Sequence, residues 1–167
     1  MKMNFVRIGL ATMVLMCGAA YAEPSEKKSP DWLTGAGSDA ERFELLQKYL
    51  RGFDQPMWEV GERFRSIHEA LSRDNYELAA YHWEKIRITI QNGYLKRPAR
   101  KANAEAILLN STWAEVKAAF DTKHADTAWA GFEKARHACM ACHAAESVPY
   151  MSNQPLFDLA RPATKSR

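Results

Sequence analysis

The sequence predicts an all-α protein, built as an antiparallel four-helix bundle with an extra short helix before it. Four long segments repeat apolar residues in steps of three and four, the spacing that places side chains on one face of a helix. The segments are joined by short connections, which in a bundle link antiparallel neighbours. We find no competing stretch with the alternating pattern of a strand.

The first 22 residues read as a signal peptide. Lys2 and Arg7 precede the apolar run 8–20, and Ala20-Tyr21-Ala22 supplies a small-x-small cleavage pattern. The alternative is an uncleaved anchor, but the run is shorter than the roughly 20 residues that a spanning helix needs. We therefore expect cleavage after Ala22, a periplasmic location and no membrane insertion of the mature chain.

Residues 23–37 are rich in Pro, Ser, Lys and Gly and are predicted to form a flexible leader. Residues 38–167 are predicted to form a single helical-bundle domain with an irregular C-terminal tail. Ser38 can cap a short helix over 39–51, which Gly52 ends. We expect this helix to pack across the main body through Phe43, Leu46 and Leu50.

Two of the four bundle helices follow in order. Asp54 caps the first, with Pro56 tolerated in its opening turn. Asp74 and Glu77 resemble a capping box for the second, and Asn92-Gly93 is suited to its C-terminal cap. The inward positions predicted for the two helices are Met57, Val60, Phe64, Ile67 and Leu71, then Tyr76, Ala79, Trp83, Ile86 and Ile90.

The other two helices are predicted over about 100–120 and from Ala125 to no further than Val148, because Pro149 follows. From Tyr150 onward we expect an irregular tail whose apolar residues Leu156, Phe157 and Leu159 dock on the body. The inward positions predicted for these helices are Ala102, Ala106, Leu109, Trp113, Val116 and Phe120, then Ala128, Phe132, Ala135, Cys139 and Cys142.

The last helix carries Cys139-Met140-Ala141-Cys142-His143, and Cys-x-x-Cys-His is the attachment signature of c-type haem. The two thiols can bond the haem vinyl groups, and His143 can bind iron as the proximal ligand. We therefore expect one covalently attached haem c. Export agrees with this, since such attachment happens outside the cytoplasm.

Three other interpretations of the motif are weaker. A redox dithiol normally lies at the start of a helix, where the dipole lowers the thiol pKa, whereas this motif lies near the end of one. A zinc site needs further ligands, and signal cleavage removes Cys17, the third cysteine. A structural disulfide would not require His143.

A haem motif on the last helix of a four-helix bundle resembles cytochrome c prime and its low-spin relatives, over about residues 55–145. The resemblance implies a haem in the bundle core, a distal residue from the first bundle helix, and a homodimer as one oligomeric option. Met57 is the matching position, and we expect it as the distal iron ligand. Met140 and Met151 are poorer candidates, and Met57 could instead be a core residue. The four other histidines, His68, His82, His124 and His137, are predicted to be solvated or structural.

Cleavage of the signal removes Lys2 and Arg7 but no acid, leaving 21 basic against 20 acidic residues. This balance gives no reason to expect nucleic-acid binding. The function we predict is electron transfer with periplasmic redox partner proteins. The alternative is a five-coordinate haem that binds nitric oxide or carbon monoxide. We expect no enzyme, because no distal His/Arg pair suited to peroxide cleavage is present.

Overall fold

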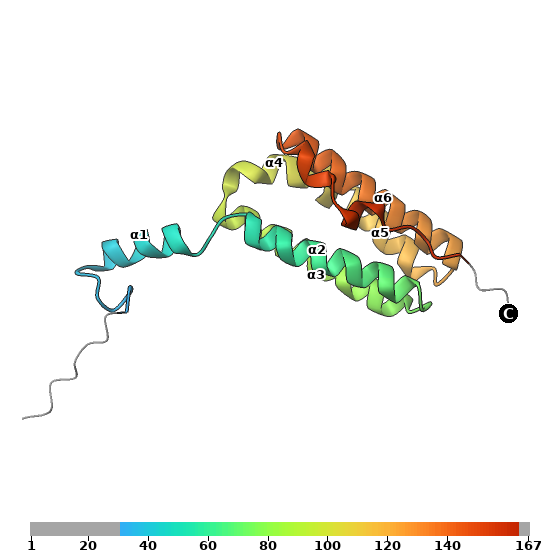
Figure 1. Cartoon of the computed structure of the whole chain (residues 1–167), viewed down its shortest axis with the longest axis horizontal. Helices are drawn as coiled ribbons and strands as arrows, with labels where there is room; N and C mark the ends of the chain where they lie inside the picture. The colour runs from blue at the N-terminus through green and yellow to red at the C-terminus, as the bar shows by residue number, and fades with distance from the viewer. Residues whose placement is uncertain (1–30, 164–167) are drawn as a thin grey trace, which may run out of the picture. The chain divides into compact units, whose positions relative to one another are not determined.

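The computed structural model describes residues 31–163, and every regular element in that range is helical. The all-α prediction is confirmed. The predicted signal peptide and residues 23–30 of the leader lie outside the described range. Within it, no helix has both the length and the apolar character needed to cross a membrane. The α-helices (Figure 1) are α1 Asp39–Tyr49, α2 Asp54–Leu71, α3 Tyr76–Lys96, α4 Lys101–Asn103, α5 Thr112–Asp121 and α6 Ala125–Ala145.

The chain divides into two compact units at Leu45, inside α1. In the first unit, the hydroxyl of Ser38 accepts a hydrogen bond from the amide of Glu41 at 3.2 Å, so the predicted cap is confirmed. The Arg42 guanidinium donates to the carbonyls of Leu33 and Ala36 and folds the preceding residues onto the first turn of α1. No residue of α1 is buried.

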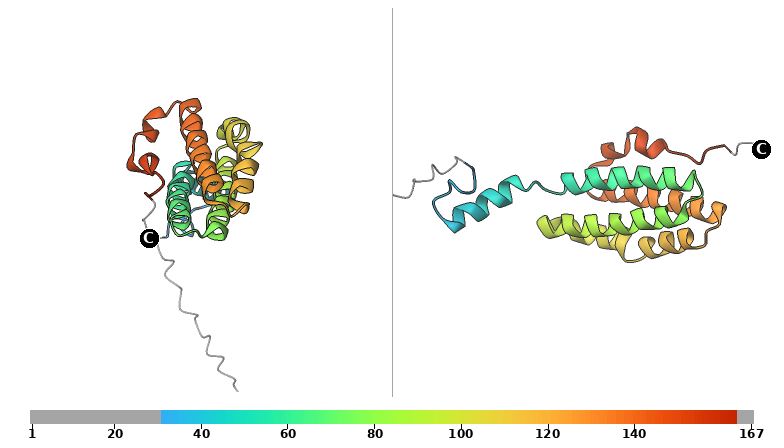
Figure 2. Two further views of the ribbon diagram at one scale, coloured as in Figure 1. Left: turned by 90° about the vertical axis from the view of Figure 1, so that its right-hand side faces the viewer. Right: turned by 90° about the horizontal axis from the view of Figure 1, so that it is seen from below.

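The second unit is built from α2, α3, α5 and α6 around one apolar core. Helix α2 packs on α3, α3 on α5, α5 on α6, and α6 on α2, as the two views of Figure 2 show. Aromatic contacts join two of these neighbouring pairs. The rings of Phe64 and Phe132 stack at 4.5 Å between α2 and α6, and Trp83 meets Phe120 edge-on at 6.5 Å between α3 and α5.

The predicted inward faces of α2, α3 and α6 are largely confirmed, because periodic apolar residues bury together on one side of each helix. Met57, Tyr76, Cys139 and Cys142 are the members that are only partly buried. The confirmed core positions of these helices are Val60, Phe64, Ile67, Leu71, Ala79, Trp83, Ile86, Ile90, Ala128, Phe132 and Ala135.

The predicted end of α3 at Asn92-Gly93 was wrong, since the helix continues to Lys96. Gly93 serves close packing instead of a cap. A Cβ atom there would lie 2.8 Å from the Phe53 ring and 3.2 Å from the Cβ of Pro56. Glycine at this position therefore lets the start of α2 approach the end of α3.

The predicted helix over 100–120 was also wrong, because it is interrupted. A π-helical segment, Ala104–Leu109, follows α4, and the chain turns at 110–111 before α5 begins. A π turn adds one residue to the helical repeat and shifts which side chains face inward. Ala104 and Leu108 are consequently buried in place of Ala102 and Ala106.

Two predicted caps are displaced by one residue. The side chain that caps α3 is Asn75, whose Oδ1 accepts the amide of Leu78 at 3.1 Å. Asp74 precedes it in a left-handed conformation, with φ of 54°, and accepts a bond from the Tyr76 hydroxyl. Asp54 lies inside the first turn of α2, and its carboxylate accepts the amide of Gly52 from the preceding loop.

Candidate haem attachment site

The predicted attachment residues lie on the last turns of α6, which ends at Ala145. Cys139 and Cys142 are three residues apart and are therefore neighbours on the helix surface. Both are free thiols rather than halves of a disulfide. Both are half-buried. The structure thus presents two adjacent, unpaired thiols immediately before His143.

Burial raises the pKa of the Cys139 thiol to about 12, with a smaller contribution from neighbouring Cys142. Burial also raises the pKa of Cys142, although the positive charge of Arg100 opposes it. Cys139 is therefore a neutral thiol at physiological pH. This disfavours the redox-dithiol interpretation, because that chemistry depends on a stabilised thiolate.

The imidazole of His143 is held from one side. Its Nδ1 lies 3.1 Å from the hydroxyl oxygen of Ser152, and its ring meets the Phe157 ring edge-on at 5.6 Å between centroids. Burial lowers the pKa of His143, which favours the neutral ring that a metal ligand must be. Among residues 31–163, no protein group bonds Nε2.

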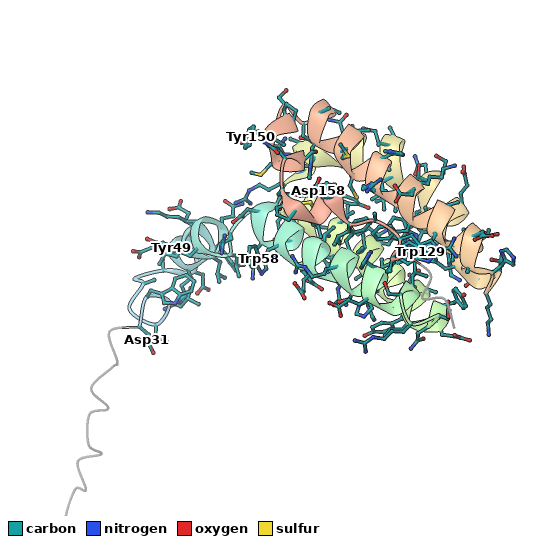
Figure 3. All side chains as sticks on the ribbon, turned by 45° about the vertical axis from the view of Figure 1, so that its right-hand side comes forward. Asp31, Tyr49, Trp58, Trp129, Tyr150 and Asp158 are labelled. Carbon is teal, nitrogen blue, oxygen red and sulfur yellow. The ribbon has the colours of Figure 1, made fainter. Side chains whose placement is uncertain are left out.

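The segment that supplies Ser152 and Phe157 folds back along the body after α6. It contains two short 3₁₀ turns, Pro149–Ser152 and Pro155–Asp158, and Figure 3 marks Tyr150 and Asp158 on them. Phe157 is buried, and Leu156 and Leu159 pack against the core, so the predicted docking of the tail is confirmed.

Arg136 fixes this tail from the middle of α6. Its guanidinium donates to the carbonyls of Phe157 and Leu159, at 3.2 and 3.0 Å, and pairs with Glu133. The Arg136 guanidinium is therefore engaged by the tail carbonyls and by Glu133.

Met57 lies in the first turn of α2, partly buried and packed against the core cluster. Figure 1 shows that the start of α2 and the end of α6 lie at the same end of the second unit. The neighbouring Trp58 is 85% exposed (Figure 3), so the first turn of α2 directs one large side chain inward and one to solvent. This end of the unit therefore combines the thiols, the imidazole and the thioether.

A further polar cluster borders the motif. The Glu146 carboxylate, which directly follows α6, pairs with Arg100 and accepts a hydrogen bond from the amide of Asn103 at 2.8 Å. The Glu146 side chain is only 13% exposed. These contacts tie the end of α6 to the segment before the π-helical turn. The sequence offered no signal for this pairing of residues more than 40 positions apart.

The chemistry of these donors fits a c-type haem. Such a haem needs two free thiols for its vinyl groups and one neutral imidazole, with a thioether as the common second ligand. Within residues 31–163, no three His, Cys, Asp or Glu side chains gather in a group able to hold a metal ion by themselves.

Comparisons of this chain with known protein families, with curated proteins and with solved structures found no match.

Proposed function

We propose that this chain is an exported monohaem c-type cytochrome that transfers electrons in the periplasm. We further propose that α2, α3, α5 and α6 form an antiparallel four-helix bundle of the cytochrome c prime kind, with the haem on α6. The observation that carries the proposal is the pair of free thiols, Cys139 and Cys142, directly before a partly buried His143 at the end of α6.

Cys139 and Cys142 would hold the group covalently. Each thiol adds its sulfur to one carbon of a vinyl double bond and its hydrogen to the other, so the step consumes no oxidant. His143 would bind iron through Nε2, the ring nitrogen that bonds no protein group within residues 31–163. When bound, the haem supplies one-electron chemistry as its iron changes between the ferric and ferrous states.

Met57 would bind iron on the opposite face through its thioether sulfur. Methionine with histidine raises the reduction potential and suits electron transfer. The support is positional, because Met57 opens the apolar face of α2 at the end of the unit where α6 ends. Met140 and Met151 are 38% and 46% exposed and have less of the burial that an axial ligand needs.

Periplasmic redox proteins are the partners that this function implies. A homodimer of the cytochrome c prime kind is also consistent with the proposal. Residues 96–101 form a basic stretch with four Lys or Arg side chains, and it is partly engaged within the chain, since Arg100 pairs with Glu146 and Lys101 with Glu105. The stretch therefore presents fewer unpaired positive charges to an acidic partner than its sequence contains.

A second candidate function is a five-coordinate haem that binds nitric oxide or carbon monoxide. The packing of Met57 against the core cluster also favours this function, because an ordinary core residue that does not bind iron packs in the same way. An apolar distal face with no ligand would leave the iron open to small neutral gases.

Met57→Ala tests which candidate holds. For the electron carrier, the purified oxidised protein shows a low-spin visible spectrum and a near-infrared band from methionine–iron bonding, and Met57→Ala loses both. The loss follows because alanine has no donor atom. Met151→Ala, which removes an exposed thioether, is the matched control and leaves the spectrum unchanged. A high-spin spectrum that Met57→Ala does not alter assigns the gas-binding function instead.

A further inference from the structure

The contact between His143 and Ser152 joins Nδ1 of the ring to a hydroxyl group, which can either donate or accept a hydrogen bond. A neutral imidazole has one N–H donor and one acceptor nitrogen. If Nε2 is to bind iron, the hydrogen must be on Nδ1. At 3.1 Å, the Ser152 hydroxyl oxygen is then placed to accept the bond from Nδ1–H. Iron binding at Nε2 therefore sets the direction of this bond, and the serine oxygen can accept it.

The plane of the ring is constrained as well. Phe157 meets the imidazole edge-on from the same tail, so this segment gives the ring both a hydrogen bond and an aromatic contact. Ligating histidines are commonly oriented by such an outer partner on the other nitrogen, which also makes the imidazole a stronger donor.

Ser152 is itself held in place by contacts spread along the tail. Beyond Phe157, the carbonyls of Phe157 and Leu159 accept bonds from Arg136, and the carbonyl of Ala160 lies 2.8 Å from Nε2 of His68 on α2. Both ends of the Ser152–Phe157 segment are therefore anchored, one by its connection to α6 and the other by α6 and α2. A hydroxyl on an anchored segment can fix a ring, whereas one on a free tail cannot.

We propose that Ser152 is a positioning residue for the haem site: its hydroxyl accepts a hydrogen bond from Nδ1–H of His143, fixes the ring and strengthens Nε2 as an iron donor. This inference rests on the proposed function, because it concerns the same iron ligand. It adds the C-terminal tail to the site, which the attachment motif alone does not include.

The test compares haem-loaded Ser152→Ala with the native protein. A weaker imidazole donor stabilises ferric iron less, so we expect the reduction potential to rise and the equilibrium constant for reduction by a fixed redox couple to increase severalfold. In the reduced, diamagnetic protein, or its carbon monoxide complex, the Nδ1–H proton signal of His143 should shift and exchange faster with water. Ser152→Thr keeps a hydroxyl and should therefore have the native reduction potential and the native Nδ1–H signal.

Ser72→Ala is the matched control, because it removes a hydroxyl that bonds the carbonyl of His68 and does not contact His143 in the described residues. This substitution should change neither the reduction potential nor the Nδ1–H signal of His143. If Ser152→Ala leaves the potential and the Nδ1–H signal unchanged, the role of Ser152 is wrong. If Ser152→Ala fails to fold, rapid solvent exchange of Nδ1–H in the native protein overturns the proposal and slow exchange supports it. A native protein without covalent haem would instead contradict the proposed function.

Discussion

The titration of one residue, His82, makes the stability of the protein depend on pH. Its Nδ1 atom is enclosed and has no hydrogen-bond partner in the part of the chain that the structure describes. Burial lowers the pKa of His82 below its usual value of 6.5, and the positive charge of Arg63 lowers it further. Protonation in the folded state would place a charge in an enclosed site beside another positive charge.

We expect the protein to lose stability in weak acid because of His82. Its pKa is lower in the folded than in the unfolded chain, so between the two values the unfolded chain binds more protons. The stabilisation is therefore fully present above pH 6.5 and is lost as the pH falls through the folded pKa. Urea unfolding of the holoprotein at a series of pH values between 7.5 and 5 measures this loss.

His82→Gln should flatten that pH dependence, since glutamine does not titrate. His124→Gln, at an exposed residue, is the control and should leave the slope as in the native protein. An equally steep loss of stability in His82→Gln would show that another group is responsible.

The proposed attachment residues are identified from the sequence alone because the motif is local, with all three side chains within five positions. Ser152 could not be identified in this way, because its contact with His143 exists only after the tail folds back. Gly93 was misinterpreted for a related reason. A glycine near a helix end usually signals a cap, but here the side chain that excludes a Cβ is Phe53, which lies 40 residues earlier.

At the scale of elements, α5 and α6 form a close helix pair that depends on Gly131. A Cβ atom at this position would lie 2.8 Å from the Cβ of Ala119, which is attached directly to the α5 backbone and cannot rotate away. The two helices can approach this closely only because one of the two facing positions has no side chain.

Gly131→Ala should therefore destabilise the protein by about 1–3 kcal/mol, as overpacked cores do, even though alanine favours helix by up to ~1 kcal/mol over glycine. Thermal or urea unfolding of the holoprotein measures the change. Gly61→Ala, inside α2, is the matched control. Its Cβ would lie 3.4 Å from the flexible end of Leu156, so we expect a neutral or stabilising effect. Equal effects of the two substitutions would contradict the close approach of α5 and α6.

The elements with regular apolar spacing, α2, α3 and α6, were predicted well because periodicity alone determines which face is buried. The segment over 100–120 was not, because its periodicity continues through the break. A regular helix would bury one set of apolar residues, Ala102, Ala106 and Leu109. The π-helical segment buries another set, Ala104 and Leu108, and the sequence pattern fits both sets equally well. Choosing between them requires knowledge of what packs opposite.

At the scale of the whole molecule, the second unit brings distant segments to the end where α6 stops. The start of α2, the segment around Arg100 and the C-terminal tail all lie near the motif or bond to its flanking residues. A single helix could display Cys139, Cys142 and His143, but a proximal ligand with an ordered outer partner requires the folded chain. The proposed distal ligand, Met57, depends on the same arrangement.

The most direct test of covalent haem attachment is the mass of the denatured protein. The protein is purified from cells that export it and can attach haem. We expect the native chain to carry the mass of one haem under denaturing conditions. Cys139→Ala with Cys142→Ala should carry none while keeping a helical circular dichroism spectrum, because the thiols are the proposed bonds to the group. Haem that separates from the native chain on denaturation, or that stays bound to the double variant, would contradict the account.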